Sequence, residues 1–160
     1  MAPVFTNLQK LKRFSRLPAI VTLVTLSLAP AQVNASSRSE TLEAIHRIEN
    51  PRDLSRPGKY GELGAYQFRQ GTWHMHTTLP FEKALDRTES EQIAVKHYEW
   101  LRRGLARNGV AQTPYNIALA WNAGLSSVVR GRTSRASHDY AQRVSNLATD
   151  LRVNQLAVAP

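Results

Sequence analysis

The sequence contains no cysteine among its 160 residues. A disulfide scaffold, a thiolate metal site and a cysteine nucleophile are therefore excluded together. Glycine and proline are scarce, at eight residues each, and their lack of any period excludes collagen-like and low-complexity sequence. Acidic residues are in the minority, with 12 Asp and Glu against 21 Lys and Arg, for a formal net charge of +9. What remains suits one globular domain that is held together by packing.

The N-terminal 35 residues are predicted to be a signal peptide. Four basic residues precede an apolar run at positions 17–29, and the small residues at 33–35 provide a cleavage site before Ser36. This order of basic, apolar and small residues is typical of export signals. The apolar run is too short for a stable membrane span, which takes roughly 20 helical residues. We therefore expect an exported protein of the periplasm or cell envelope, or a secreted one.

The mature chain would keep a modest positive charge. Removal of residues 1–35 takes away four basic and no acidic residues, which leaves a net charge of +5. Such an excess favours a polyanionic partner, such as nucleic acid, anionic lipid or a cell-wall polymer. Because an exported protein is not expected to act on DNA, we predict a partner in the envelope and no nucleic acid.

Residues 36–152 are predicted to form a single, mainly α domain. Their apolar spacing is helical nearly throughout, and no segment alternates long enough to predict a strand. The first helix is predicted to begin at Ser39, as its N-cap, and to end near Glu49, because Pro51 disfavours helical geometry at the residue before it. Glycine and proline mark residues 51–64 as a loop. The buried face of the first helix is predicted to carry Leu42, Ile45 and Ile48.

A long helix is predicted later in the chain. Thr88 and Glu91 have the spacing of a capping box that opens this helix, and Asn108 with Gly109 is expected to end it. Its apolar stripe follows helical spacing and consists of Ala94, Tyr98, Leu101 and Leu105.

Two more helices are predicted before the C-terminus. Thr113 and Pro114 fit the N-cap and first position of a short apolar helix that ends at Gly124. The last helix is predicted to begin near Ser137, and residues 153–160 to form a flexible tail.

The end of the first helix holds the candidate catalytic residue. Glu49 directly follows the predicted buried face, and partial burial would disfavour its charged form and raise its pKa. Gln67 comes eighteen residues later, in the glycine-containing segment 61–68 that would let the backbone approach a ligand. The alternative is that Glu49 is a solvated helix-end acid and that the glycines only make turns.

Four motifs in a fixed order connect this region to a known family. Together they resemble the soluble lytic transglycosylases of the lysozyme-like superfamily, over roughly residues 40–150. The motifs are Glu49 before a polar loop, Gly61-x-x-Gly64-x-x-Gln67, Asn122-Ala123-Gly124 after an apolar helix, and Tyr140 leading to Val144. The chain departs from the family pattern at four places: Asn50 stands for a usual Ser, Tyr66 for a Met, Trp121 for a Tyr, and 137–139 for Glu-Thr-Arg.

The resemblance implies a single lysozyme-like helical domain with a groove for peptidoglycan glycan strands. Glu49 would be the single general acid/base, Gln67 and Asn122 would line the groove, and Tyr140 would orient the glutamate. Tyr66 and Trp121 are the aromatic residues chosen for sugar contact, because sugar rings stack on aromatic faces. The implied reaction cleaves the β-1,4 bond between N-acetylmuramic acid and N-acetylglucosamine and leaves 1,6-anhydro ends, without a cofactor.

Two other functions remain open. A lysozyme-type hydrolase would act on the same bond but would ordinarily use two carboxyl groups, and Glu62 is the candidate for the second, unless it is a hydrated loop acid. A catalytically inactive peptidoglycan-binding module, such as a scaffold in an envelope complex, is the alternative outside the enzymes. No metal site is expected, because His74 and His76 are two residues apart on a predicted helix and have no evident third ligand.

Overall fold

The computed structural model describes residues 29–158. Most of the predicted signal peptide therefore lies outside the described residues. Positions 29–35 already belong to the first helix, α1 (Ala29–Glu49). Ser39, the predicted N-cap, lies inside this helix, whereas the predicted end at Glu49 is confirmed.

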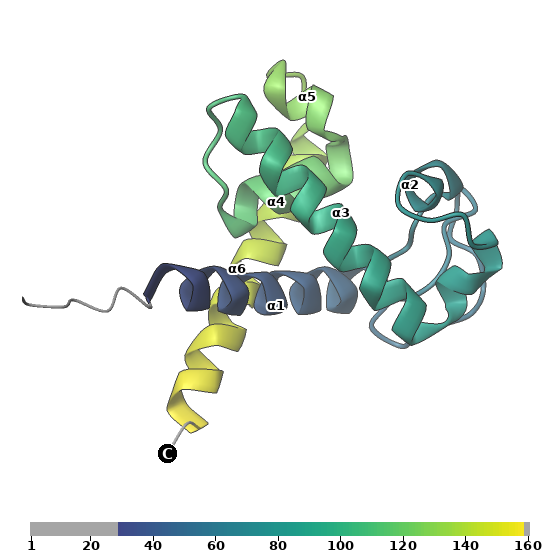
Figure 1. The fold of residues 1–160 in the computed structure, drawn as a ribbon, viewed down its shortest axis with the longest axis horizontal. Helices are drawn as coiled ribbons and strands as arrows, with labels where there is room; N and C mark the ends of the chain where they lie inside the picture. Colours follow the sequence, from purple (N-terminus) through teal and green to yellow (C-terminus); the bar gives the residue numbers. More distant parts are fainter. Residues whose placement is uncertain (1–28, 159–160) are drawn as a thin grey trace, which may run out of the picture.

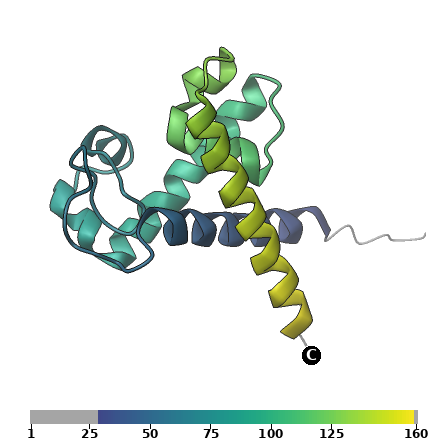
Figure 2. The same ribbon diagram turned by 180° about the vertical axis from the view of Figure 1, so that it is seen from behind.

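Helix α6 (Arg135–Val158) crosses α1 and also packs against α4 (Pro114–Ala123) (Figures 1 and 2). The faces that meet are small and apolar, so the helices approach closely. Among the side chains that they bury completely are Ala44, Ile45, Ile117, Ala118, Ala141 and Val144.

Helix α3 (Arg87–Arg107) is the long helix of the sequence analysis, but its N-cap differs from the prediction. The Asp86 carboxylate accepts hydrogen bonds from the backbone N–H groups of Thr88 and Glu89, at 3.0 and 3.1 Å. The capping box of Thr88 and Glu91 is therefore wrong, and Glu91 instead pairs with Arg87 at 2.7 Å. Asn108 ends the helix as predicted.

The predicted start and end of α4 are confirmed. The Thr113 hydroxyl accepts a hydrogen bond from the backbone N–H of Asn116 at 3.2 Å, and Pro114 is the first helical residue. Gly124 ends the helix with a positive φ of 83°, a conformation that glycine adopts without steric cost. A short helix that the sequence did not predict, α5 (Leu125–Val129), follows at once.

The C-terminal helix differs from its prediction at both ends. It begins at Arg135, slightly before Ser137, and it continues to Val158. The segment predicted as a flexible tail from Val153 is therefore helical as far as the structure describes it. Val153 and Leu156 are exposed on this last part, at 58% and 69%. The last turns of the helix therefore bury no apolar face of the kind by which the sequence analysis identified helices.

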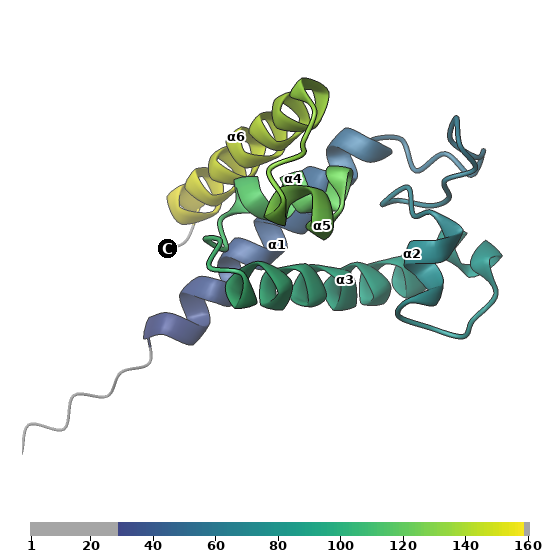
Figure 3. The same ribbon diagram turned by 90° about the horizontal axis from the view of Figure 1, so that it is seen from above.

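Loop 50–69, α2 (Gln70–His74) and the 3-10 helix η1 (Phe81–Leu85) gather at one end of the molecule, where α1 ends and α3 begins (Figures 1 and 3). Leu63 and Phe68 form an isolated antiparallel bridge in the loop, and residues 29–158 contain no longer strand. Gly64 fixes the loop against η1, since a Cβ atom there would overlap the backbone carbonyl of Ala84. No helix within the described part of the chain has the length and apolar character to cross a bilayer.

Candidate active site

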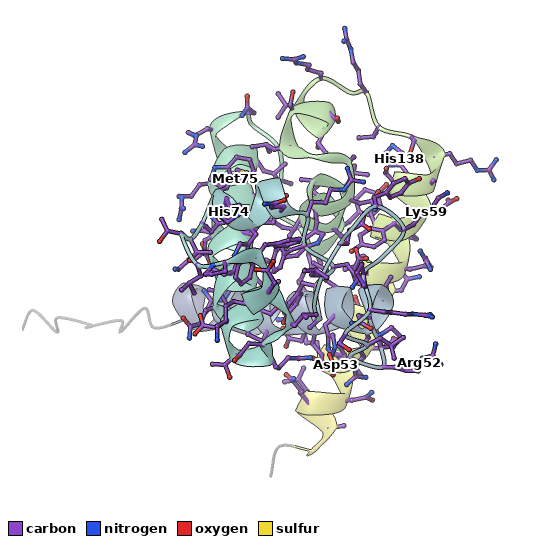
Figure 4. The ribbon with its side chains drawn as sticks, turned by 90° about the vertical axis from the view of Figure 1, so that its right-hand side faces the viewer. Arg52, Asp53, Lys59, His74, Met75 and His138 are labelled. Carbon is purple, nitrogen blue, oxygen red and sulfur yellow. The ribbon has the colours of Figure 1, made fainter. Side chains whose placement is uncertain are left out.

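A cavity of about 490 Å³ lies between loop 50–69 and the C-terminal end of α4. The loop covers one face of the molecule, with Arg52 and Asp53 at its lower edge and Lys59 higher up, as Figure 4 shows. Four of the six predicted site residues line the cavity: Glu49, Gln67, Trp121 and Asn122. Residues that are distant in the sequence thus line one cavity.

Glu49 is the last residue of α1 and is held by a residue of α6. The Tyr140 hydroxyl donates a hydrogen bond to Glu49 Oε1 at 2.8 Å, which confirms the predicted contact between these side chains. Burial is the largest effect on the pKa of Glu49 and raises it, and the negative charge of Glu62 also raises it. The Tyr140 hydrogen bond and the positive charge of Arg143 lower this pKa. The net result is a pKa above the usual value. Burial also raises the pKa of Tyr140 far above its usual value, so the hydroxyl stays protonated and remains a donor.

Gln67 is placed by a strained backbone. Its φ is +44°, in the left-handed region that costs a residue with a Cβ on the order of 1–3 kcal/mol. Its side-chain amide donates to the carbonyl of Gly64 at 2.9 Å. On the other side lies Gly58, where a Cβ would come within 2.6 Å of Gln67 Oε1. Strain of this kind at a cavity wall is typical of functional sites.

Glu62 is a second carboxylate on the same cavity. Its side chain is 15% exposed, accepts a hydrogen bond from the backbone N–H of Tyr60 at 2.8 Å and lies 3.4 Å from Arg69 Nε. Burial alone would raise the pKa of Glu62, but these backbone and Arg69 interactions together lower it. The two carboxyl groups therefore have pKa values that are displaced in opposite directions, which is how one site keeps an acid and a carboxylate at the same pH.

The two aromatic residues chosen for sugar contact have different places. Trp121, near the C-terminal end of α4, is half-buried and lines the cavity. The choice of Tyr66 was wrong, because its side chain is only 3% exposed and does not line the cavity. Its ring instead packs between those of His46 and Trp121, with centroids 5.9 and 6.1 Å away.

Tyr60 is the aromatic residue that the sequence analysis missed. It is 68% exposed and lines the cavity, with Lys59 Nζ and Arg69 Cζ 5.3 and 5.4 Å from the centroid of its ring. Its position between Gly58 and Gly61 was the available signal, since a turn of this kind exposes the residues at its tip.

A smaller cavity of about 350 Å³ adjoins the first. The two cavities share Glu49, Gly58, Lys59 and Gln67, and Arg56 lines only the smaller one. Glu49 thus borders both cavities. An elongated ligand could place groups on both sides of the carboxyl group.

The two histidines considered for a metal have separate surroundings. His74 is exposed, whereas His76 Nε2 is hydrogen-bonded to His97 Nδ1 at 2.9 Å. Residues 29–158 contain no group of three or more His, Asp or Glu side chains arranged to hold a metal ion.

Comparisons of the chain with protein-family models, curated proteins and solved structures found no significant match. The function of the protein is therefore inferred from the chemistry of the site. A carboxyl group with a raised pKa, held by a hydroxyl donor and facing an open cavity with aromatic walls, is suited to proton transfer to a bound polar ligand.

Proposed function

We propose that the protein is a peptidoglycan lytic transglycosylase with Glu49 as its single general acid/base. The observation that carries the proposal is the position of Glu49. Its carboxyl group is partly buried, faces the cavity and accepts a hydrogen bond from Tyr140. The ordered motifs of the sequence supply the class of substrate, and two adjoining cavities that both border Glu49 leave room for a glycan strand.

In the proposed reaction Glu49 first acts as an acid. The protonated carboxyl group donates its proton to the glycosidic oxygen between N-acetylmuramic acid and N-acetylglucosamine, and the bond to C1 of the muramic acid breaks. The acetamido oxygen of the substrate stabilises the positive charge that develops at C1, so no second carboxylate is needed, as in substrate-assisted glycosidases.

Glu49 then acts as a base. Its carboxylate takes the proton from the O6 hydroxyl of the same muramic acid, and O6 attacks C1 to close the 1,6-anhydro ring. The first proton stays on the leaving hydroxyl group, the O6 proton returns the glutamate to its protonated form, and no water is consumed. A raised pKa favours the first step, while the Tyr140 hydrogen bond stabilises the carboxylate between the two steps.

Hydrolysis by a lysozyme-type mechanism is the second candidate. Glu62 favours it, because this second carboxylate lines the same cavity and has a lowered pKa. Glu62 would then support a water molecule that attacks C1. However, a hydrogen bond from the Tyr60 backbone and an ion pair with Arg69 already engage its two oxygens, and this favours a role in holding the loop.

Mass analysis of the products tests the proposal and separates the two reactions. Purified sacculi digested by the protein are expected to yield fragments that are lighter by one water than hydrolysis products. Glu49→Gln should abolish clearing of a wall suspension and leave sedimentation with walls intact. Glu82→Gln is the matched control, because this exposed residue of η1 lies outside the cavity.

The results of these experiments distinguish the lytic transglycosylase, the lysozyme-type hydrolase and the inactive binding module. Hydrolysed ends that disappear in Glu62→Gln would favour the lysozyme-type reaction. Wall binding without any clearing by the unaltered protein would favour an inactive binding module, which could act as a scaffold in an envelope complex. Clearing that persists in Glu49→Gln would contradict both enzymatic proposals. Export to the periplasm or cell envelope is part of the proposal and follows from the sequence at 1–35.

A further inference from the structure

His97 is a buried polar residue on the wall of the cavity, and the reaction proposed above does not use it. It lies on α3, is 6% exposed and lines the cavity together with Trp121 and Phe68. In the sequence it falls on the core-facing stripe of a long helix, where a histidine gives no sign of a ligand.

The ring of His97 is held firmly in one orientation. It stacks on Trp100 with an interplanar angle of 12° and meets Trp121 edge-on, with centroids 4.8 Å apart. His97 Nδ1 is hydrogen-bonded to His76 Nε2 at 2.9 Å. Such fixing removes the entropy cost of ordering the side chain when a ligand binds.

The second ring nitrogen, Nε2, has no hydrogen-bond partner among residues 29–158. His97 Nε2 is not one of the fully buried polar atoms without a partner in the described residues, so solvent or a ligand can reach it on the cavity side. Burial and the neighbouring His76 lower the pKa of His97 to about 3, so the ring is neutral at the pH of any bacterial compartment. A neutral imidazole suits an uncharged amide or hydroxyl group rather than an anion.

The surroundings of Nε2 favour a group with a polar part and a methyl part. Trp121 provides apolar surface beside His97, and the buried ring of Phe68 packs against Trp121 with the centroids 5.7 Å apart. An acetamido group fits these surroundings, because its methyl can pack on the Trp121 ring while its amide meets the imidazole.

We propose that His97 Nε2 binds the 2-acetamido group of a glycan sugar in the cavity and thereby selects N-acetylated strands. This inference rests on the proposed function in taking the ligand to be a glycan. His76 is then a positioning residue, because it holds Nδ1 and leaves Nε2 to the ligand.

Equilibrium binding to two neutral oligosaccharides tests the inference. Chitotetraose carries an acetamido group on every sugar, and cellotetraose has hydroxyl groups in their place. The Glu49→Gln protein, which should not cleave, is expected to bind chitotetraose roughly five- to tenfold more tightly, the ratio that one good hydrogen bond provides. Adding His97→Asn should abolish this preference, because Asn keeps a polar group near Nδ1 but cannot reach the position of Nε2.

His97→Gln is the matched variant, since its longer amide can reach the position of Nε2 and should retain part of the preference. NMR of the unmutated histidine adds a readout that does not depend on a variant's folding. The ring ¹⁵N signals of His97 should shift when chitotetraose is added and stay unmoved with cellotetraose.

Equal preference in the Glu49→Gln protein with and without His97→Asn, or ring signals that do not respond, would overturn the inference and leave His97 as packing for Trp121. Wall clearing by the unaltered chain keeps this failure separate from that of the proposed function. If the walls are cleared and the acetamido preference does not depend on His97, only the inference fails. If walls are not cleared but the preference depends on His97, the binding inference stands and the cleavage proposal fails.

Discussion

At the scale of single residues, the buried carboxyl group of Glu49 links folding stability to pH. Its pKa in the folded chain is raised by burial, so folding disfavours the ionised form. Below the unfolded pKa both states are protonated and nothing is lost, whereas stability falls as the pH rises through the folded pKa. Glu49→Gln should therefore raise the melting temperature at pH 8 and leave it nearly unchanged at pH 3. A larger gain at pH 3, measured by thermal unfolding, would contradict the burial of this group.

Tyr140→Phe isolates the role of the hydroxyl group. Its hydrogen bond lowers the pKa of Glu49 against the upward effect of burial, so its loss should raise that pKa further. In the profile of kcat/KM the basic limb should move to higher pH, and activity at the optimum should fall by about tenfold or more, the loss of a bond to a charged group. Tyr115→Phe, which removes a hydroxyl bonded to His138 at 2.6 Å, is the control. An unchanged basic limb would contradict the role of Tyr140.

Gly58 offers a test of the loop geometry at the same scale. A Cβ there would come within 2.6 Å of Gln67 Oε1 and 2.7 Å of Glu62 Oε2. Gly58→Ala should displace both side-chain ends and lower kcat/KM, with a small effect on stability because these ends can move. Gly71→Ala is the matched control, since nothing lies within 4 Å of a Cβ at that position. Equal activities of the two variants would show that Gln67 and Glu62 do not shape the site.

At the scale of secondary-structure elements, the start of α3 separates the observed cap from the predicted one. Asp86→Ala removes the side chain that accepts two backbone hydrogen bonds, and should cost about 1 kcal/mol of unfolding free energy. Thr88→Ala should cost less, because the Thr88 side chain does not cap the helix. Denaturant unfolding of both variants measures the difference, and the reverse order would restore the capping box that the sequence suggested.

The ends of helices show what the sequence could and could not predict. Local chemistry was enough where one residue type determines the geometry, as with Pro51 after α1, Thr113 before α4 and Gly124 after it. It failed at Asp86 and Thr88, because both are good caps and tertiary packing decides which one begins the helix. It also failed after Val153, where exposed apolar side chains carry no periodic signal.

The sequence predicted the carboxyl group of the candidate site, but only some of the residues that line the cavity. Glu49 followed from its place after a buried helix face, and its partner Tyr140 followed from the family resemblance. Tyr66 was wrongly chosen because an aromatic residue in a glycine-containing segment can point to either side, and only packing against His46 decides that it points inward. His97 lay beyond sequence reasoning, since its neighbours in the cavity come from other elements.

At the scale of the whole molecule, the positive charge of the protein should act through the smaller cavity beside Glu49. Arg56 and Lys59 line it beside Glu49, where the carboxylates of a wall polymer would be attracted. The double change Arg56→Gln with Lys59→Gln should weaken sedimentation with walls in low salt, and the difference should shrink at high salt, as screening requires. Arg107→Gln, at the far end of α3, removes one positive charge away from the cavity and is the control for each single change, Arg56→Gln or Lys59→Gln. Binding that is indifferent to salt in all of these proteins would exclude an electrostatic contribution.

The hydrogen bond between Glu49 and Tyr140 joins residues 91 positions apart, on helices near the two ends of the described chain. During synthesis the glutamate leaves the ribosome long before its tyrosine partner does. A nascent or truncated chain that lacks α6 would leave the carboxyl group solvated, with an ordinary acidity and no fixed direction. For the proposed enzyme, catalytic competence would then depend on α6, so a chain that stops before Tyr140 should not clear walls.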